Sequence, residues 1–189
     1  MTRRGWHRAL AVGLGLFLAL HLANHLAGLW GQDVHAAVQG ALRLIYRNPV
    51  VEPLLLAAFA VQAGIGVSML ARRRRVTLQT ASGAYLAVFL VIHVGAVLTA
   101  RWQGTDTDLA FAAAGLHAGP PWPIILALYY GLAVLAVFAH LSVPVGRRHP
   151  RAAQLTLALG FGLAVSLVLL LLGVLTQLVI PTALIAAFP

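Results

Sequence analysis

Charged residues are scarce in this chain. Only 9% of its 189 residues are Asp, Glu, Lys or Arg, whereas 61% are hydrophobic. A soluble domain typically carries about 25% charged residues, because its surface has to stay in contact with water. A chain with so little charge is expected to expose most of its surface to lipid. The composition therefore predicts an integral membrane protein that contacts membrane lipid.

Cysteine and lysine are both absent. Without a thiol, the chain cannot form a disulfide, a thiolate metal site or an iron–sulfur cluster of its own. Without a lysine amine, it cannot hold retinal or pyridoxal phosphate as a Schiff base. All 13 basic residues are Arg, and they lie in short runs between apolar segments. The net charge of +9 is therefore interpreted as marking membrane topology, and binding to nucleic acid is not expected.

Five apolar segments are long enough to cross a membrane, which takes about 20 residues of helix for roughly 30 Å of hydrocarbon. Backbone polar groups cannot stay unpaired in lipid, so each segment is expected to be α-helical. We predict an all-α bundle of five transmembrane helices in a single domain, 1–189, with Pro181 ending the regular part of the last helix. The predicted spans are about 9–30, 50–71, 80–100, 122–145 and 153–180.

The Arg residues lie mostly in alternate connections between these spans. Ten of them fall before the first span, after the second or after the fourth, which would place them on one face of the membrane. The opposite face receives three Arg and all four acidic residues, and its connections, 31–48 and 102–120, are the longer ones. Because Arg and Lys accumulate in cytoplasmic loops, we expect the face with ten Arg, and with it the N-terminus, to be cytoplasmic. The run Arg72–Arg75 either orients its helix pair or docks an acidic partner or anionic lipid headgroups.

Four His residues fall inside the predicted spans: His21, His25, His93 and His140. A His inside the hydrocarbon region suggests a functional site, because burying an imidazole there costs free energy. The alternative is a structural His that packs by hydrogen-bonding a neighbouring helix. At about 1.5 Å per residue, His21 lies roughly 18–20 Å, and His93 about 20 Å, from the cytoplasmic start of its helix. Two neutral imidazoles at similar height between apolar walls can ligate the iron of a b-type haem.

The other two His residues have different expected roles. His140 lies near the cytoplasmic end of the fourth span, and the residue at similar height on the second span is Gln62. His25 lies one helical turn outside His21 on the same face. It could contact a haem propionate, assist quinone binding or replace His21 as the ligand.

Four segments carry a resemblance to a known family. The run 15–25 leads through apolar residues to His21 and then an Asn, and the segment 78–85 (Leu-Gln-Thr-Ala-Ser-Gly-Ala-Tyr) leads to His93 and a later Arg. The second span carries a Glu, a Gln and a Gly at positions 52, 62 and 66, and the fourth carries Phe-Ala-His at 138–140. With these features the whole chain resembles the five-helix dihaem cytochrome b subunit of bacterial succinate dehydrogenases and fumarate reductases.

The resemblance implies a b-type haem subunit that passes electrons between a peripheral partner and membrane quinone. It implies His21 and His93 as ligands of an outer haem and His140 as a ligand of an inner one, with Glu52 and Arg101 as candidate quinone contacts. The second span has no His, and Gln62 stands at the place of the family's fourth ligand, so the sequence favours one haem and leaves the second open. The implied partners are flavoprotein and iron–sulfur subunits on the cytoplasmic side, and the chain itself would be a non-catalytic or a quinone-reactive subunit.

Two alternatives stay open at this point. The first is a membrane anchor of the same fold that has lost haem, which the Gln at position 62 favours. The second is a transporter or metal-handling protein that uses His21 and His25 in the membrane. In that case loop residues would complete an outer metal site, and the candidates are His35, His117, Asp33, Asp106 and Asp108.

Overall fold

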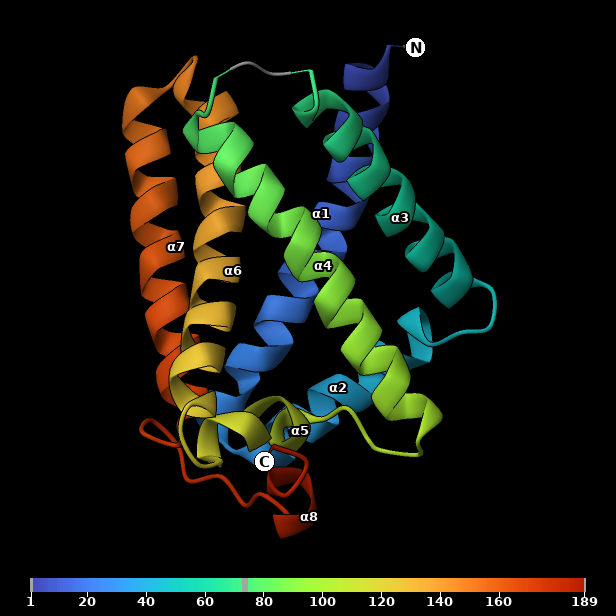
Figure 1. Ribbon diagram of the computed structural model, residues 1–189, viewed down its shortest axis with the longest axis vertical. Coiled ribbons are helices and arrows are strands. Elements are labelled where there is room, and N and C mark those ends of the chain that lie inside the picture. Colours follow the sequence, from blue (N-terminus) through green and yellow to red (C-terminus); the bar gives the residue numbers. More distant parts are fainter. Residues whose placement is uncertain (1, 73–74, 189) are drawn as a thin grey trace. The chain divides into compact units, whose positions relative to one another are not determined.

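The computed structural model describes residues 2–72 and 75–188. Within these residues every regular element is helical (Figure 1). The chain forms two compact units, Met1–Arg74 (unit 1) and Arg75–Pro189 (unit 2), and each is described by itself.

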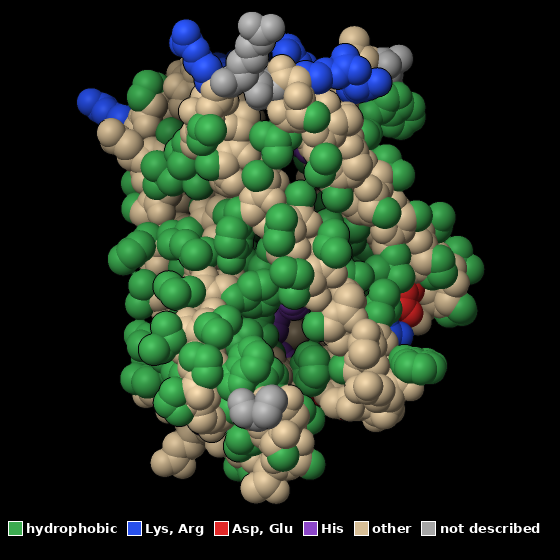
Figure 2. All heavy atoms as spheres, viewed as in Figure 1, with side chains coloured by type: hydrophobic (Ala, Val, Ile, Leu, Met, Phe, Trp, Pro, Cys, Tyr) green, Lys and Arg blue, Asp and Glu red, His purple; other side chains and the backbone are tan. Residues whose placement is uncertain are grey.

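Five helical segments of the described residues are long and apolar enough to cross a membrane, which confirms the predicted number. Large hydrophobic side chains such as Leu16, Val91 and Ile124 are exposed along these segments. Figure 2 shows hydrophobic side chains spread over much of the visible surface, as expected for helices in contact with lipid. The segments are Arg3–Trp30, Val51–Leu70, Leu78–Trp102, Trp122–Gly146 and Pro150–Leu171.

In unit 1 the described residues form three helices and one 3-10 turn: α1 (Arg3–Ala27), η1 (Gly28–Trp30), α2 (Gln32–Tyr46) and α3 (Val51–Leu70). Helices α1 and α3 pack against each other, and α2 contacts both of them. Gly31 has a φ of 119°, which favours glycine, and it lets the chain turn from η1 into α2. Phe17 of α1 joins the three helices, because its ring meets Tyr46 of α2 at 5.7 Å and Phe59 of α3 at 5.5 Å, both edge to face.

Helix α2 replaces a predicted outer loop. The sequence analysis expected a connection over 31–48, but residues Gln32–Tyr46 are helical. His35 and Gln39, which lie one turn apart, are buried, and Arg43 follows one turn later. This spacing places the polar residues on one inward face of an amphipathic helix. The sequence analysis took the polar residues of this segment as a sign of a loop.

The described residues of unit 2 form five helices and one 3-10 turn: α4 (Leu78–Trp102), α5 (Leu109–Ala113), η2 (Ala114–His117), α6 (Trp122–Gly146), α7 (Pro150–Leu171) and α8 (Thr182–Ile185). Helix α6 packs against both α4 and α7. Thr77 and Thr80 form a capping box that starts α4. Tyr85 of α4 donates a hydrogen bond of 2.8 Å to the carbonyl of Tyr129 on α6.

The last predicted span is too long. The sequence analysis extended it to residue 180, but α7 ends at Leu171. Gly173, with a φ of 73°, donates to the carbonyl of Leu170, and Val174 donates to the carbonyl of Leu169. This is a Schellman motif, which ends a helix through a glycine in the left-handed region. The apolar run continues past this glycine, so hydrophobicity alone could not locate the end.

Candidate functional site

Two imidazoles of α1 lie together in unit 1. The rings of His21 and His25 are 4.7 Å apart and perpendicular to each other. Their spacing of four residues places both side chains on one face of the helix, as the sequence predicted. The ring of His25 also lies 6.0 Å from that of His35 on α2.

A buried polar cluster lies next to these two His residues, between α1 and α2. Asn24 is 4% exposed and His35 is 1% exposed, and the Asn24 amide nitrogen lies 3.3 Å from His35 Nε2. Asn24 Oδ1 is buried and has no hydrogen-bond partner among the described residues, so the cluster holds an unused acceptor. The sequence analysis considered His35 only as a loop ligand for a metal ion. The spacing of His35 and Gln39 along α2 was the signal that could have placed it inside the unit.

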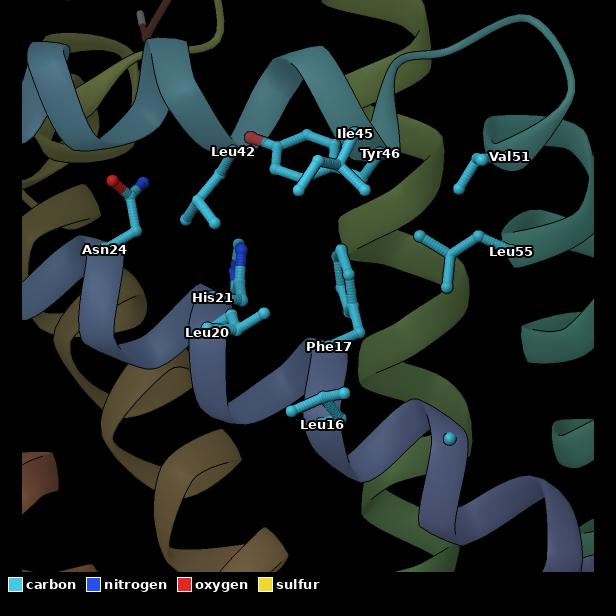
Figure 3. A pocket seen from close by; sticks show the side chains of 11 residues that line it. Leu16, Phe17, Leu20, His21, Asn24, Leu42, Ile45, Tyr46, Val51 and Leu55 are labelled. Carbon is cyan, nitrogen blue, oxygen red and sulfur yellow. The ribbon is translucent and has the colours of Figure 1, made fainter.

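His21 lines a pocket of about 200 Å³ within unit 1 (Figure 3). Figure 3 shows the rings of Phe17 and His21 extending from α1 toward Leu42, Ile45 and Tyr46 of α2. The imidazole of His21 and the amide of Asn24 are the most polar groups of a lining that is otherwise mostly apolar. The complete lining is Gly13, Leu16, Phe17, Leu20, His21, Asn24, Leu42, Ile45, Tyr46, Val51 and Leu55.

His93 lies in an aromatic row on α4 of unit 2. Its ring stacks on Phe89 at 5.1 Å with an angle of 14° between the planes, and Phe89 contacts Tyr129 of α6 at 4.6 Å. Tyr85, one turn earlier on α4, stacks on Phe89 at 6.4 Å. Residues 85, 89 and 93 therefore share one face of α4, and the hydrogen bond from Tyr85 fixes that face against α6.

His140 of α6 lies against the first turns of α4. Its Nδ1 is 3.1 Å from the carbonyl oxygen of Gln79 and 3.3 Å from Ser82 Oγ. The Ser82 hydroxyl already donates to the carbonyl of Leu78 at 2.6 Å. When Nδ1 donates to the Gln79 carbonyl, Nε2 carries the free lone pair of the ring. Metal-binding His residues commonly have this tautomer, because a carbonyl partner fixes the proton on the other nitrogen. Gly83 leaves room for the ring, because a Cβ at this position would lie 3.1 Å from His140 Cε1.

Gln62 of α3 stands where the resemblance implies a fourth ligand. The structure gives it a His neighbour that the sequence analysis did not consider. The Gln62 amide nitrogen lies 3.5 Å from Nε2 of His7 on α1. His7 precedes the first predicted span, which was expected to start at about residue 9. Because α1 begins at Arg3, His7 lies in its second turn, inside the helix.

The candidate quinone contacts lie at helix ends in different units. Glu52 is in the first turn of α3 in unit 1, and Arg101 is in the last turn of α4 in unit 2. His21 and His93 likewise belong to different units. Within the run Arg72–Arg75, Arg73 and Arg74 lie outside the described residues, whereas Arg72 and Arg75 are exposed.

The proposed outer metal site finds little support in the described parts of the chain, where no group of three or more His, Asp or Glu side chains could hold a metal ion. His117 Nε2 donates instead to the carbonyl of Leu171 at 2.9 Å, which satisfies the C-terminal end of α7. Asp108 caps α5 by accepting from the Phe111 amide at 2.9 Å. These two residues therefore have structural roles.

No family model, curated protein or solved structure matches this chain.

Proposed function

We propose that the chain is a b-type haem-binding membrane subunit of a succinate dehydrogenase/fumarate reductase-like complex. It passes electrons between a peripheral partner on the cytoplasmic side and quinone in the membrane. His21 (or His25) of α1 and His93 of α4 are the proposed ligands of the outer haem. The N-terminus is proposed to be cytoplasmic, on the strength of the Arg distribution, and the membrane to be the bacterial inner membrane.

The observation that carries the proposal is the position of His21 in the wall of an apolar pocket in unit 1. An imidazole among Leu, Phe and Ile side chains suits haem iron, because imidazole is a haem ligand and the macrocycle is apolar. Pockets that enclose drug-sized ligands have volumes of roughly 300–1,000 Å³. A pocket of about 200 Å³ is smaller than these and could take in only part of a haem, whereas the donor type and the apolar lining agree with the group.

The surroundings of the other His residues are also compatible with iron ligation. The stacking of His93 on Phe89 restricts the orientation of the imidazole, and the aromatic row offers the apolar surface that a macrocycle needs. His140 has its Nδ1 on a backbone carbonyl, which is the usual outer partner of a metal-binding His. A bound haem would supply one-electron transfer, and the chain would supply ligands, orientation and a water-poor environment.

The quinone contacts are proposed at the outer ends of the helices. The Arg101 guanidinium can donate to a quinone carbonyl oxygen, the Glu52 carboxylate can accept from a quinol hydroxyl, and both residues are half-buried near helix ends. Asn24 adds a third candidate, because its buried Oδ1 has no hydrogen-bond partner among the described residues and can accept from a quinol hydroxyl. The exposed residues Arg72 and Arg75 are proposed to dock an acidic surface of the peripheral partner.

A second candidate function is a haem-free membrane anchor of the same fold. The observation that favours it is that His140 already has two packing partners on α4, Gln79 and Ser82, which is what a structural His would show.

A reduced-minus-oxidised visible spectrum of the purified protein, with haem quantified per chain, separates these two functions. A low-spin b-type spectrum that disappears in His93→Ala supports the cytochrome. The matched control is His149→Ala, which replaces an exposed His between α6 and α7. Absence of haem after expression with ample haem supply would exclude the cytochrome and leave the anchor.

A further inference from the structure

An apolar groove lies between α1 and α3 of unit 1. It has a volume of about 340 Å³, and the four residues of α1 and four residues of α3 that line it are all apolar. The lining includes the small residues Ala9, Gly13 and Ala58. A Cβ at Gly13 would meet nothing within 4 Å among the described residues, and Leu54 in the groove wall is 65% exposed. The side chains of unit 1 therefore leave this space open.

The size and the lining of the groove suit a hydrocarbon chain. Pockets for small molecules have volumes of roughly 300–1,000 Å³. An α-helix with its side chains is about 10–12 Å across, so a helix of a partner protein could not enter a space of about 340 Å³. A lipid acyl chain is narrow and flexible, and in a groove it gains dispersion contacts on several sides. Because the lining is apolar, the polar part of such a molecule has to lie outside the groove.

The first turns of α1 supply a polar end for this site. Leu10 lines the groove, Trp6 precedes it by four residues and Arg3 precedes Trp6 by three, so the three residues share one side of α1. Trp6 is 53% exposed, and Arg3 is exposed as well. Trp is enriched at membrane interfaces, and a guanidinium pairs well with a phosphate. The order of guanidinium, indole and apolar groove matches the phosphate, glycerol and acyl chain of a phospholipid.

The depth of the groove agrees with this order. At 1.5 Å per residue, the lining residues of α1 between Ala9 and Leu14 lie roughly 9–17 Å beyond Arg3 along the helix. A hydrocarbon core of about 30 Å gives each leaflet about 15 Å. The groove therefore lies at the depth of the acyl chain of a lipid whose headgroup is level with Arg3.

The charge at this end of unit 1 favours an anionic headgroup. Helix α1 begins at the end of unit 1 where α3 finishes (Figure 1). The two acids of the unit, Asp33 and Glu52, belong to the first turns of α2 and α3, away from this end. Basic residues near the membrane surface attract anionic lipids. The basic residues that the structure describes at this end are Arg3, Arg4, Arg8 and Arg72.

From these observations we propose that unit 1 binds one anionic glycerophospholipid of the leaflet on the Arg-rich side. One acyl chain occupies the groove between α1 and α3, and the phosphate lies beside Arg3 and Trp6. The proposal does not depend on the cytochrome function. It goes beyond general contact with membrane lipid, because it assigns one site with a preference for a charged headgroup.

The headgroup preference can be measured by native mass spectrometry of the full-length protein, delipidated in detergent and titrated with lipid. We expect one phosphatidylglycerol to bind at least about fivefold more tightly than phosphatidylcholine, because an Arg near the surface contributes about that factor. Arg3→Gln should weaken phosphatidylglycerol binding about fivefold and remove the preference. Arg8→Gln is the matched control, because Arg8 projects from the opposite side of α1 and should affect binding less. Glycerol phosphate, which has the charge without the acyl chains, should bind far more weakly.

The role of the groove can be measured in the same titration. Ala58→Trp fills the groove and should lower phosphatidylglycerol binding at least tenfold, whereas Ala57→Trp, at an exposed position outside the groove, should leave it unchanged. Leu54→Trp gives the same test at an exposed position of the groove wall if Ala58→Trp does not fold.

Three results would overturn the proposal. Equal binding of phosphatidylglycerol and phosphatidylcholine would exclude a charge-selective site. Equal losses in Arg3→Gln and Arg8→Gln would mean that lipid gathers at a generally basic surface. Unchanged binding in a folded groove-filling variant, or glycerol phosphate binding as tightly as the lipid, would mean that no acyl chain enters the groove. Haem content does not enter this comparison, so the test holds whether or not the protein is a cytochrome.

Discussion

The imidazole of His140 on α6 lies directly against the backbone of Gly83 on α4. A Cβ at Gly83 would come within 3.1 Å of His140 Cε1, which is tighter than ordinary van der Waals contact. The same imidazole reaches the carbonyl of Gln79, one turn earlier on α4. Gly83 therefore allows the two helices to approach closely enough for this polar contact, a role that small residues often have between membrane helices.

We expect Gly83→Ala to lower thermal stability in detergent by less than the roughly 1–3 kcal/mol typical of overpacking. The added methyl group pushes the His140 ring away from its contacts on α4, but Ala regains about 1 kcal/mol of helix preference over Gly. Combining it with His140→Ala should remove most of this penalty, since the clashing ring is then absent. Double-mutant thermal unfolding measures this coupling. Strictly additive losses would mean that the two side chains do not interact.

A second close approach joins α6 and α7 within unit 2. A Cβ at Gly160 would collide with the side chain of Phe138, whereas a Cβ at Gly162 would meet nothing within 4 Å. We expect Gly160→Ala to destabilise the protein by about 1–3 kcal/mol through overpacking. Gly162→Ala is the matched control, and it should be neutral or stabilising because Ala favours helix by about 1 kcal/mol over Gly. Equal melting temperatures for the two variants would contradict the packing described.

The tyrosine pair between α4 and α6 allows a graded test. Tyr85→Phe removes a 2.8 Å hydrogen bond to the carbonyl of Tyr129, and it should cost about 0.5–1.5 kcal/mol. Tyr129→Phe removes only a 3.4 Å contact to the carbonyl of Phe89 and should cost less. Denaturation of both variants under identical conditions checks the order, and a larger loss for Tyr129→Phe would be inconsistent with these distances.

The sequence predicted the long apolar helices better than the elements at their ends. Apolar runs of 20 or more residues identify a spanning helix almost regardless of detail, and the second, third and fourth spans end within about two residues of the observed helices. By contrast, α2 was read as a loop, and α7 was extended past Gly173. Both errors arose because hydropathy does not register an inward polar face or a left-handed glycine.

The candidate site was predictable only in part. The spacing of His21 and His25 fixed their common face, and the structure places the two rings together. The sequence could not show that His35 is buried beside them, because that depends on how α2 folds back onto α1. It also gave no reason to single out His7, whose neighbour Gln62 is 55 residues away along the chain.

The pocket of unit 1 can be filled without altering its proposed ligand. Leu42→Trp places a larger side chain into the lining, so it should reduce the haem content attributed to His21 while the protein still folds. Leu44→Trp is the matched control on the same helix, because Leu44 is 81% exposed and does not line the pocket. The pyridine haemochrome assay on both variants gives the comparison. Full haem content in Leu42→Trp would mean that the group does not enter this pocket.

The absence of cysteine makes the proposed topology directly measurable, since a single introduced thiol has no native competitor. Thr2 and Gln103 are both exposed, one before α1 and one just after α4. With a cytoplasmic N-terminus, Gln103→Cys should react with a membrane-impermeant maleimide in spheroplasts, and Thr2→Cys should react only after the membrane is opened. The reverse pattern would place the ten-Arg face outside, against the bias of Arg and Lys toward cytoplasmic loops.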